Sequence, residues 1–277
     1  MPCAKEAKMI TFANPQHKPT LVKYVHMLET LFLKSIKHFS QLESTNTEAE
    51  HWISKSRPAE GSAVLADFQS CGQGLGQNTW ESEQGLNLLV SFVLYPAILP
   101  ADQQFTLNKV ASLAVRACAQ HFLPSGYEAL IKWPNDIYAG YKKIAGILSR
   151  NTIAGQNIES TIIGVGLNVN QSRFSRALPN PVSLKMLSGN TFSIDEVLRQ
   201  LAFYLQKFYT MLNDDNIEEI DKQYLSALLN YQREASYSAS GLRFTGTILG
   251  VSKYGRLIME IENEIKDFDL KEIRFIF

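Results

Sequence analysis

The sequence contains little cysteine: Cys3, Cys71 and Cys118 are the only three in 277 residues, and they lie far apart. No CxxC pair occurs, which argues against a structural zinc site and against a disulfide framework. The five histidines are equally dispersed and show no ligand spacing. Because unpaired cysteines are typical of a reducing compartment, we expect a cytoplasmic protein.

The sequence also lacks an excess of charge of either sign. Lysine and arginine together number 27, as do aspartate and glutamate, so the formal net charge is zero. There is no basic surplus to indicate a nucleic-acid partner. No apolar run is long enough to cross a membrane, and the first residues lack the apolar core of a secretion signal. With 45% hydrophobic residues, the chain can bury one large core and a small appended domain.

The patterns divide the chain into three parts. Residues 1–35 form a lead-in, in which a short helix is predicted at 26–32. Residues 36–230 mix apolar strands with amphipathic helices. Residues 231–277 contain short strands, with turns predicted at Gly250 and at Tyr254-Gly255, which indicates a small barrel-like module. We expect strands at 36–42, 63–68, 87–95, 129–138, 144–149, 159–169 and 267–277, and helices at 45–54, 103–123, 193–212 and 216–229.

The most informative segment reads Lys132-Trp133-Pro134-Asn135-Asp136, six residues, and then Lys143-Ile144-Ala145-Gly146-Ile147-Leu148. Its apolar flanks place it on or between strands. A buried sheet tolerates charged groups only where they are paired or bind something. Two lysines, an amide and a carboxylate therefore favour an anionic, phosphate-bearing ligand. The alternative is an edge strand that Pro134 interrupts and whose charges are solvated.

Three other segments combine polar groups or glycines in ways that suit a ligand. Glu43-Ser44-Thr45-Asn46 offers hydroxyl and amide groups, but it also fits an ordinary helix N-cap. A glycine-rich loop, Gly72-Gln73-Gly74-Leu75-Gly76, follows a strand and leads to Trp80; it allows close approach to a ligand, or it is a flexible hairpin. Gly164-Val165-Gly166-Leu167-Asn168 is a strand whose glycines leave room for a ligand or for close packing.

Taken in order, these four segments resemble the signature of the biotin–protein ligases, and the resemblance covers about residues 36–277. It implies an α+β fold, with a mixed β-sheet and flanking helices like the class II synthetases and the biotin–lipoate ligase catalytic domain. It also implies a small C-terminal SH3-like β-barrel. The lead-in does not match, and it is too short for the winged helix-turn-helix of some members. The resemblance therefore implies a short form without a DNA-binding domain.

The resemblance also implies a role for each matched position. Lys143 and Lys132 are the implied catalytic residues, and Lys143 would meet both the biotin carboxylate and the reacting phosphate. Gln69 matches a side chain that contacts the ureido ring of biotin. The implied biotin-binding residues are Ser44, Thr45, Asn46, Gln69, Gly72, Gln73, Gly74, Leu75, Lys143, Gly146, Gly164 and Gly166. The implied nucleotide-binding residues are Trp80 (against adenine), Lys132, Asn135, Asp136 and Asn168, with Asp136 also a candidate Mg²⁺ ligand.

The implied reaction has two steps. Biotin and ATP, with Mg²⁺, give biotinyl-5'-AMP and pyrophosphate, and a lysine of a biotin carboxyl carrier protein domain then attacks the adenylate. No nucleophilic side chain is required, so Cys71 is expected to be a small packing residue. The resemblance leaves a homodimer open and implies neither a nucleic-acid nor a membrane partner.

Two alternatives share some of these features. One is a lipoate or octanoate transferase of the same fold, against which the two lysine motifs and the polar Ser44 and Gln69 argue. The other is a non-catalytic biotin-binding module, because the family loop often reads G-R-G-R-x-G-R whereas residues 72–78 contain no cation. A charge-assisted hydrogen bond contributes about 1.5–3 kcal/mol. We therefore expect weaker nucleotide retention, unless a cation such as Lys142, Arg150 or Arg274 takes over. Gln77 stands where a glycine is common, so the loop should also bend differently.

Overall fold

The computed structural model describes residues 8–10, 32–97, 99–213 and 216–277. The helix predicted at 26–32 lies outside these ranges except for Phe32, which lies in a turn. The larger part of the molecule is built on an eight-stranded sheet in the order β1-β2-β3-β4-β8-β7-β6-β5. Its strands are β1 Lys8–Ile10, β2 Ile36–Phe39, β3 Ala63–Ala66, β4 Leu88–Leu94, β5 Ala129–Lys132, β6 Asp136–Ala139, β7 Lys142–Ala154 and β8 Asn157–Leu167.

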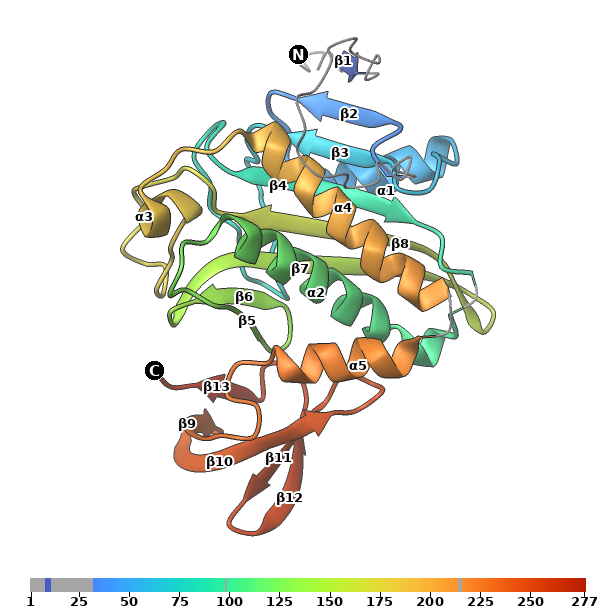
Figure 1. Ribbon diagram of the computed structural model, residues 1–277. Coiled ribbons are helices and arrows are strands. Elements are labelled where there is room, and N and C mark those ends of the chain that lie inside the picture. Colours follow the sequence, from blue (N-terminus) through green and yellow to red (C-terminus); the bar gives the residue numbers. More distant parts are fainter. Residues whose placement is uncertain (1–7, 11–31, 98, 214–215) are drawn as a thin grey trace, which may run out of the picture.

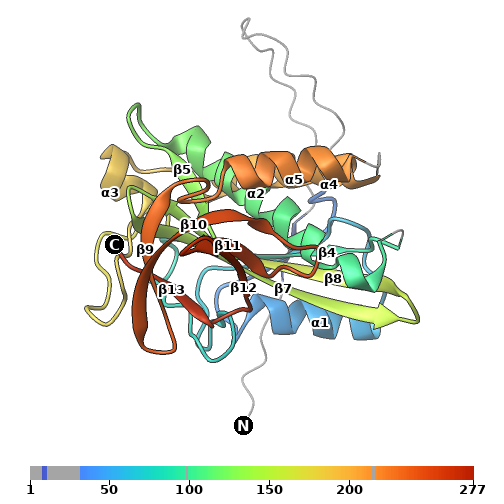
Figure 2. The same ribbon diagram turned by 90° about the horizontal axis from the view of Figure 1, so that it is seen from below.

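The sheet is mixed, because β2 and β3 are parallel whereas the other neighbouring strands are antiparallel. Every residue of β4 is buried, which explains its nearly continuous apolar run. Helix α1 covers one face of the sheet, and α2 and α4 cover the other (Figures 1 and 2), so the main core lies between the sheet and these two helices. The helices are α1 Thr45–Lys55, η1 Ala101–Gln103, α2 Phe105–Phe122, α3 Leu184–Ser188, α4 Ile194–Asn213 and α5 Ile217–Ser226.

The C-terminal residues form a second, antiparallel sheet of five strands in the order β12-β11-β10-β9-β13, as expected for an SH3-like module. It lies beside the β5 end of the large sheet, next to α5 (Figure 1). The indole Nε1 of Trp133 donates a 2.9 Å hydrogen bond to the carbonyl of Gly255, which joins the two parts. The strands are β9 Glu234–Ala239, β10 Leu242–Val251, β11 Leu257–Ile261, β12 Glu264–Phe268 and β13 Ile273–Phe275.

Three of the predicted elements are wrong in detail. The single strand expected at 129–138 is a hairpin, β5–β6, that turns at residues 133–135. The strand expected at 267–277 is interrupted by a turn at 269–272. The chain does not turn at Gly250, because β10 continues through it with a register shift between Ile248 and Gly250. The turn expected at Gly255 is present, with φ of 88°.

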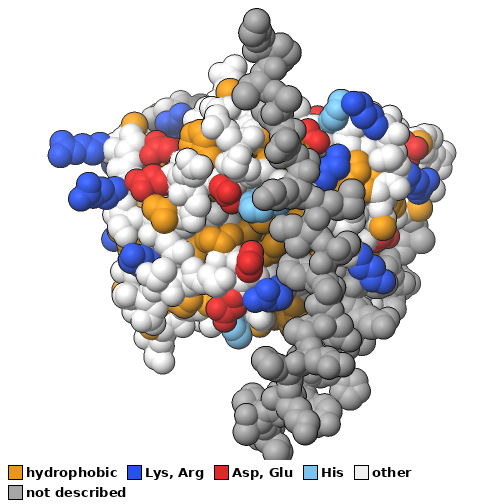
Figure 3. All heavy atoms as spheres, turned by 90° about the horizontal axis from the view of Figure 1, so that it is seen from above, with side chains coloured by type: hydrophobic (Ala, Val, Ile, Leu, Met, Phe, Trp, Pro, Cys, Tyr) orange, Lys and Arg blue, Asp and Glu red, His pale blue; other side chains and the backbone are white. Residues whose placement is uncertain are grey.

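No helix within the described residues is both long and apolar enough to cross a membrane. Figure 3 shows one face of the molecule, on which Lys and Arg side chains are interspersed with Asp and Glu among the described residues. This distribution agrees with the balanced charge of the sequence.

Candidate functional site

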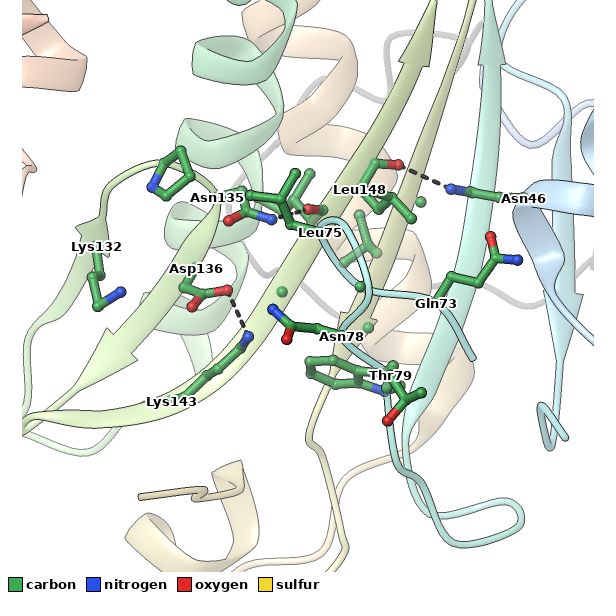
Figure 4. A pocket seen from close by; sticks show the side chains of 18 of the residues that line it. Asn46, Gln73, Leu75, Asn78, Thr79, Lys132, Asn135, Asp136, Lys143 and Leu148 are labelled. Atoms are coloured by element: carbon green, nitrogen blue, oxygen red, sulfur yellow. Dashed lines mark hydrogen bonds and ion pairs between the residues drawn. The ribbon is translucent and has the colours of Figure 1, made fainter. Parts of the chain in front are cut away.

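The candidate site is a pocket, called the main pocket below, over the strands β7 and β8. Its walls come from the start of α1, the loop 69–80, the β5–β6 turn and residues 271–273 (Figure 4). All of the predicted site residues line it except Gly72 and Asn168. The lining residues are Ser44, Thr45, Asn46, Gln69, Gln73, Gly74, Leu75, Asn78, Thr79, Trp80, Lys132, Trp133, Pro134, Asn135, Asp136, Lys143, Gly146, Ile147, Leu148, Gly164, Val165, Gly166, Lys271 and Ile273.

One end of the main pocket is neutral and polar, and Asn46 is fixed there across three strands. Its Nδ2 donates to the carbonyl of Leu148 on β7 at 3.0 Å, and its Oδ1 accepts from the hydroxyl of Ser91 on β4 at 2.6 Å. Between these partners lies Gly164 of β8, where an added Cβ would lie 2.2 Å from the Asn46 Oδ1 atom. A side chain at position 164 would collide with the Asn46 amide, so a glycine is required where this buried amide lies across the sheet.

Gln69 caps the helix that carries Thr45 and Asn46. Its Oε1 accepts from the backbone N–H of Thr45 at 2.7 Å and lies 3.1 Å from the Thr45 hydroxyl. Ser44 occupies the N-cap position, but its hydroxyl makes no capping hydrogen bond. Because Gln69 satisfies an N–H group that the helix leaves open, it fixes this polar end of the pocket.

The indole of Trp80 rests on two glycines of the sheet floor. Gly146 of β7 and Gly166 of β8 lie opposite each other in the ladder. An added Cβ would lie 3.0 Å from the indole at Gly146 and 2.4 Å from it at Gly166. The indole N–H is buried and has no hydrogen-bond partner among the residues that the structure describes. The glycine gaps thus accept an aromatic ring inside the pocket, and that ring offers an unused donor.

The opposite end of the main pocket is cationic (Figure 4). Lys143 Nζ lies 2.6 Å from Asp136 Oδ1 and 5.6 Å from the centre of the Trp80 ring. Lys132 lies between two aromatic rings, 4.9 Å from that of Phe275 and 5.7 Å from that of Tyr138.

Burial lowers the pKa of Lys132 from its ordinary 10.5; the Asp136 carboxylate opposes this effect and Lys143 adds to it. A bound anion would stabilise both ammonium groups, whose repulsion is only partly offset by one carboxylate.

Two asparagines that were predicted to meet the nucleotide have partners within the protein. Asn135 Nδ2 donates to the carbonyl of Ile147 at 2.6 Å, which holds the β5–β6 turn against β7. Asn168 Nδ2 donates to the carbonyl of Val182 at 3.0 Å, whereas its Oδ1 is buried and has no partner in the described part of the chain. Asn168 lines an adjoining pocket that shares Trp80, Lys132, Asp136 and Lys143 with the main pocket. An unsatisfied acceptor there suits a ligand with a donor group.

The glycine-rich loop forms a hairpin that extends over the main pocket. The N–H of Trp80 donates to the carbonyl of Gly72 at 2.9 Å, and the N–H of Gly74 donates to the carbonyl of Asn78 at 2.8 Å. Gly72 lies at the base of the hairpin, where an added Cβ would lie 2.4 Å from the carbonyl oxygen of Trp80. It therefore shapes the loop rather than lining the pocket.

Several lining or supporting residues were not predicted. Ser91 was overlooked because it lies in an otherwise apolar strand, and a buried serine in such a run is the signal that could have revealed it. Lys271 and Ile273 come from the C-terminal module, and no local pattern connects them to the pocket. The other unpredicted lining residues are Asn78, Thr79, Trp133, Pro134, Ile147, Leu148 and Val165.

The described residues contain no group of three or more His, Cys, Asp or Glu side chains that could enclose a metal ion. Asp136 is the one carboxylate among the residues that line the main pocket, and it pairs with Lys143. Mg²⁺ usually binds through one or two carboxylates together with substrate phosphates. This arrangement therefore fits an ion that a nucleotide brings with it.

The sequence is similar to proteins that are named as ligases, several of them as biotin–protein ligases. The model of the biotin/lipoate A/B protein ligase family matches residues 38–168. The bifunctional ligase/repressor BirA of Bacillus spizizenii is 28% identical over 233 residues, which cover 82% of this chain and 70% of the relative. The biotin–[acetyl-CoA-carboxylase] ligase of Paracoccus denitrificans is 26% identical over 227 residues, with coverages of 79% and 92%.

A solved structure shares the fold. The biotin protein ligase of Aquifex aeolicus, in complex with biotin and ATP, superposes with a TM-score of 0.72 at 23% identity, and covers 87% of this chain and 99% of that one. The family match runs from His38 in β2 through Asn168, so it includes every predicted site residue. Residues 38–168 therefore match the biotin/lipoate A/B protein ligase family, and the named relatives support a ligase.

Proposed function

We propose that the protein is a biotin–protein ligase, which forms biotinyl-5'-AMP from biotin and ATP and then transfers biotin to a lysine of a biotin carboxyl carrier protein domain. The observation that carries the proposal is the continuity of a neutral polar end, around Asn46 and Gln69, with a cationic end, around Lys132 and Lys143, in one pocket. Biotin has the same polarity, with a neutral ureido ring at one end and a carboxylate at the other.

The neutral end suits the ureido ring because it is buried and uncharged. The relative exposures of Ser44, Thr45 and Asn46 are only 4%, 4% and 3%. A charged ligand group would be costly there, whereas a neutral group with donors and acceptors can exchange hydrogen bonds with hydroxyls and amides. The ring would enter beside the hydroxyl groups, and the apolar stem of biotin would point toward Lys143.

The cationic end suits the first step, in which the carboxylate of biotin attacks the α-phosphorus of ATP. Both reactants are anions, so their approach requires positive charge between them. Lys143 would contact the carboxylate and the α-phosphate, and Lys132 would contact the phosphates from the β5 side. Asp136 could hold a Mg²⁺ ion on the phosphates, and that ion would supply further charge neutralisation.

The adjoining pocket suits the adenosine part of ATP. Trp80 offers an aromatic face, and the unpaired Oδ1 of Asn168 could accept from the amino group of adenine. The hairpin 72–80 would then cover the adenylate and exclude water from the mixed anhydride. In the second step, the amine of the acceptor lysine attacks the biotinyl carbonyl and AMP leaves. We assign residues 36–230 to this chemistry and residues 231–277 to a module that completes the pocket.

The test is an adenylation and transfer assay with purified protein. Biotin with ATP and Mg²⁺ should release pyrophosphate, and addition of a carrier domain should give a mass increase on one lysine. Lipoate in place of biotin should release none. Equal turnover of lipoate would support the transferase alternative, and tight biotin binding without pyrophosphate release would support a binding module.

A further inference from the structure

Lys271 of the C-terminal module lies against the glycine-rich loop. It lines the main pocket together with Ile273, although both belong to the module rather than to the large sheet. A Cβ built on Gly76 would lie 1.9 Å from the Lys271 Nζ atom and 2.6 Å from its Cε atom. The ammonium group therefore occupies the space that a side chain at position 76 would fill. This space exists only because residue 76 is a glycine.

The turn that carries Lys271 is held by Arg256. The guanidinium contacts Asp267 at 2.5 Å, Asp269 at 3.0 Å and Glu272 at 3.6 Å, so the carboxylates beside Lys271 are already paired. Lys271 itself makes no ion pair with any residue that the structure describes. Its φ of 72° is uncommon for a side chain with a Cβ. Strained backbone of this kind tends to persist where it places a functional group.

The other cations that could replace those missing from the loop are less suitable. Arg150 pairs with Glu50 at 2.6 Å and with the side chain of Gln73. Lys142 and Arg274 do not line the main pocket. Residues 72–78 themselves contain no cation. Lys271 is thus the lining cation that lies against the loop at Gly76, while Lys132 and Lys143 belong to the strands β5 and β7.

We propose that Lys271 binds the phosphates of ATP and of the adenylate, in place of cations on the loop. The inference rests on the proposed function for its substrate, and it adds a third ammonium group to the phosphate region. It also explains why the loop lacks the arginines that are common in the family. Gly76 makes room for an ammonium group that comes from another part of the chain. The glycine-rich loop and the C-terminal module then hold the nucleotide together.

Binding and kinetics of Lys271 variants test the proposal. Lys271→Ala should weaken ATP binding, measured by calorimetry without biotin, by about tenfold or more, as expected for one lost charge-assisted hydrogen bond. The KM for ATP and the dissociation rate of the adenylate should rise similarly, while the Kd of biotin stays the same. Lys271→Arg should restore most of the ATP affinity. Lys266→Ala removes an exposed lysine of the same module that pairs with Glu264, and it should change nothing.

A second pair of variants tests the contact with the loop. Gly76 and Gly85 both have φ of 70°, but an added Cβ contacts Lys271 only at Gly76 and nothing within 4 Å at Gly85. Gly76→Ala should therefore weaken ATP binding more than Gly85→Ala, although both strain the backbone equally. In the Lys271→Ala background, the excess effect of Gly76→Ala should disappear.

The outcomes separate this inference from the proposed function. Unchanged ATP binding in Lys271→Ala, with pyrophosphate release intact in the unmodified protein, overturns the inference and leaves the ligase function standing. Weaker ATP binding in Lys271→Ala, in a protein that releases no pyrophosphate with biotin, supports the phosphate contact and refutes the function. Thermal melting of each variant verifies that the fold is retained.

Discussion

Lys143 and Asp136 form an ion pair of 2.6 Å between Nζ and Oδ1 across the neighbouring strands β6 and β7. Before ligands bind, the Asp136 carboxylate therefore neutralises the Lys143 ammonium group, which is proposed to contact the biotin carboxylate and the α-phosphate. A phosphate or a carboxylate in the main pocket would compete with Asp136 for the ammonium group. In the absence of ligands, the ion pair thus gives the half-buried ammonium group of Lys143 a counter-charge.

Lys143→Ala should abolish adenylate formation and leave the fold intact. The variant removes the ammonium group between the two reacting anions, and rate losses of at least about 10²-fold are typical for such electrostatic contacts. Pyrophosphate release in the presence of biotin and ATP measures the effect. Lys142→Ala is the matched control, because Lys142 is the exposed neighbour on the same strand. Near-normal release by Lys143→Ala would refute the assignment.

The two floor glycines should separate biotin binding from nucleotide binding. Gly164→Ala displaces Asn46 and should weaken biotin binding, whereas Gly166→Ala displaces Trp80 and should weaken ATP binding. Each variant is the control for the other, since they add the same methyl group two residues apart on β8. Calorimetry with biotin and with ATP measures both constants. Equal losses of both ligands in both variants would indicate general damage to the sheet instead.

Lys132 should give the protein a pH-dependent stability. Because its pKa in the folded state is lowered, the unfolded state binds more protons between that pKa and 10.5, and stability rises with pH in this window. Lys132→Met removes this dependence. The Tm of the variant minus that of the unmodified protein should be highest at neutral pH and should fall as the pH approaches 10.5. A difference that does not vary with pH would contradict the lowered pKa.

The glycine-rich loop, residues 70–80, should become more protected when ligands bind. The free loop has glycines at 72, 74 and 76, so closing over a ligand orders a flexible backbone. Hydrogen exchange of its amides should slow after addition of biotin and ATP. The amides of β11, which lies in the C-terminal module, provide the reference. Exchange in the loop that ligands leave unchanged would argue against closure.

The sequence predicts the main pocket well where residue type alone carries the information. Gly164 and Gly166 stand out in an apolar strand because they leave room for Asn46 and Trp80. Lys132 and Lys143 stand out because charges are rare between buried strands. Both kinds of signal are local, and the four segments were assigned to one site through their order, which resembles that of the biotin–protein ligases.

The features that the sequence did not predict depend on distant contacts. Lys271 reaches Gly76 only because the C-terminal module packs at the β5 edge of the sheet, and no local pattern encodes that packing. The hairpin at Pro134 was predicted as one strand because its flanks are apolar on both sides. Gly250 was predicted as a turn, although a glycine without a Cβ suits a β-bulge equally well.

The main pocket draws on residues from opposite ends of the described chain, Ser44 at one end and Ile273 at the other. Contacts so far apart in sequence form late in folding, because a long loop must close before they give any stabilisation. A protease cut between α5 and β9 would therefore separate the C-terminal module from the large sheet. A melting curve of the large sheet alone would not reveal what this cut does to the main pocket. The fragment could retain the polar end around Asn46, but it would lose the wall that Lys271 and Ile273 provide.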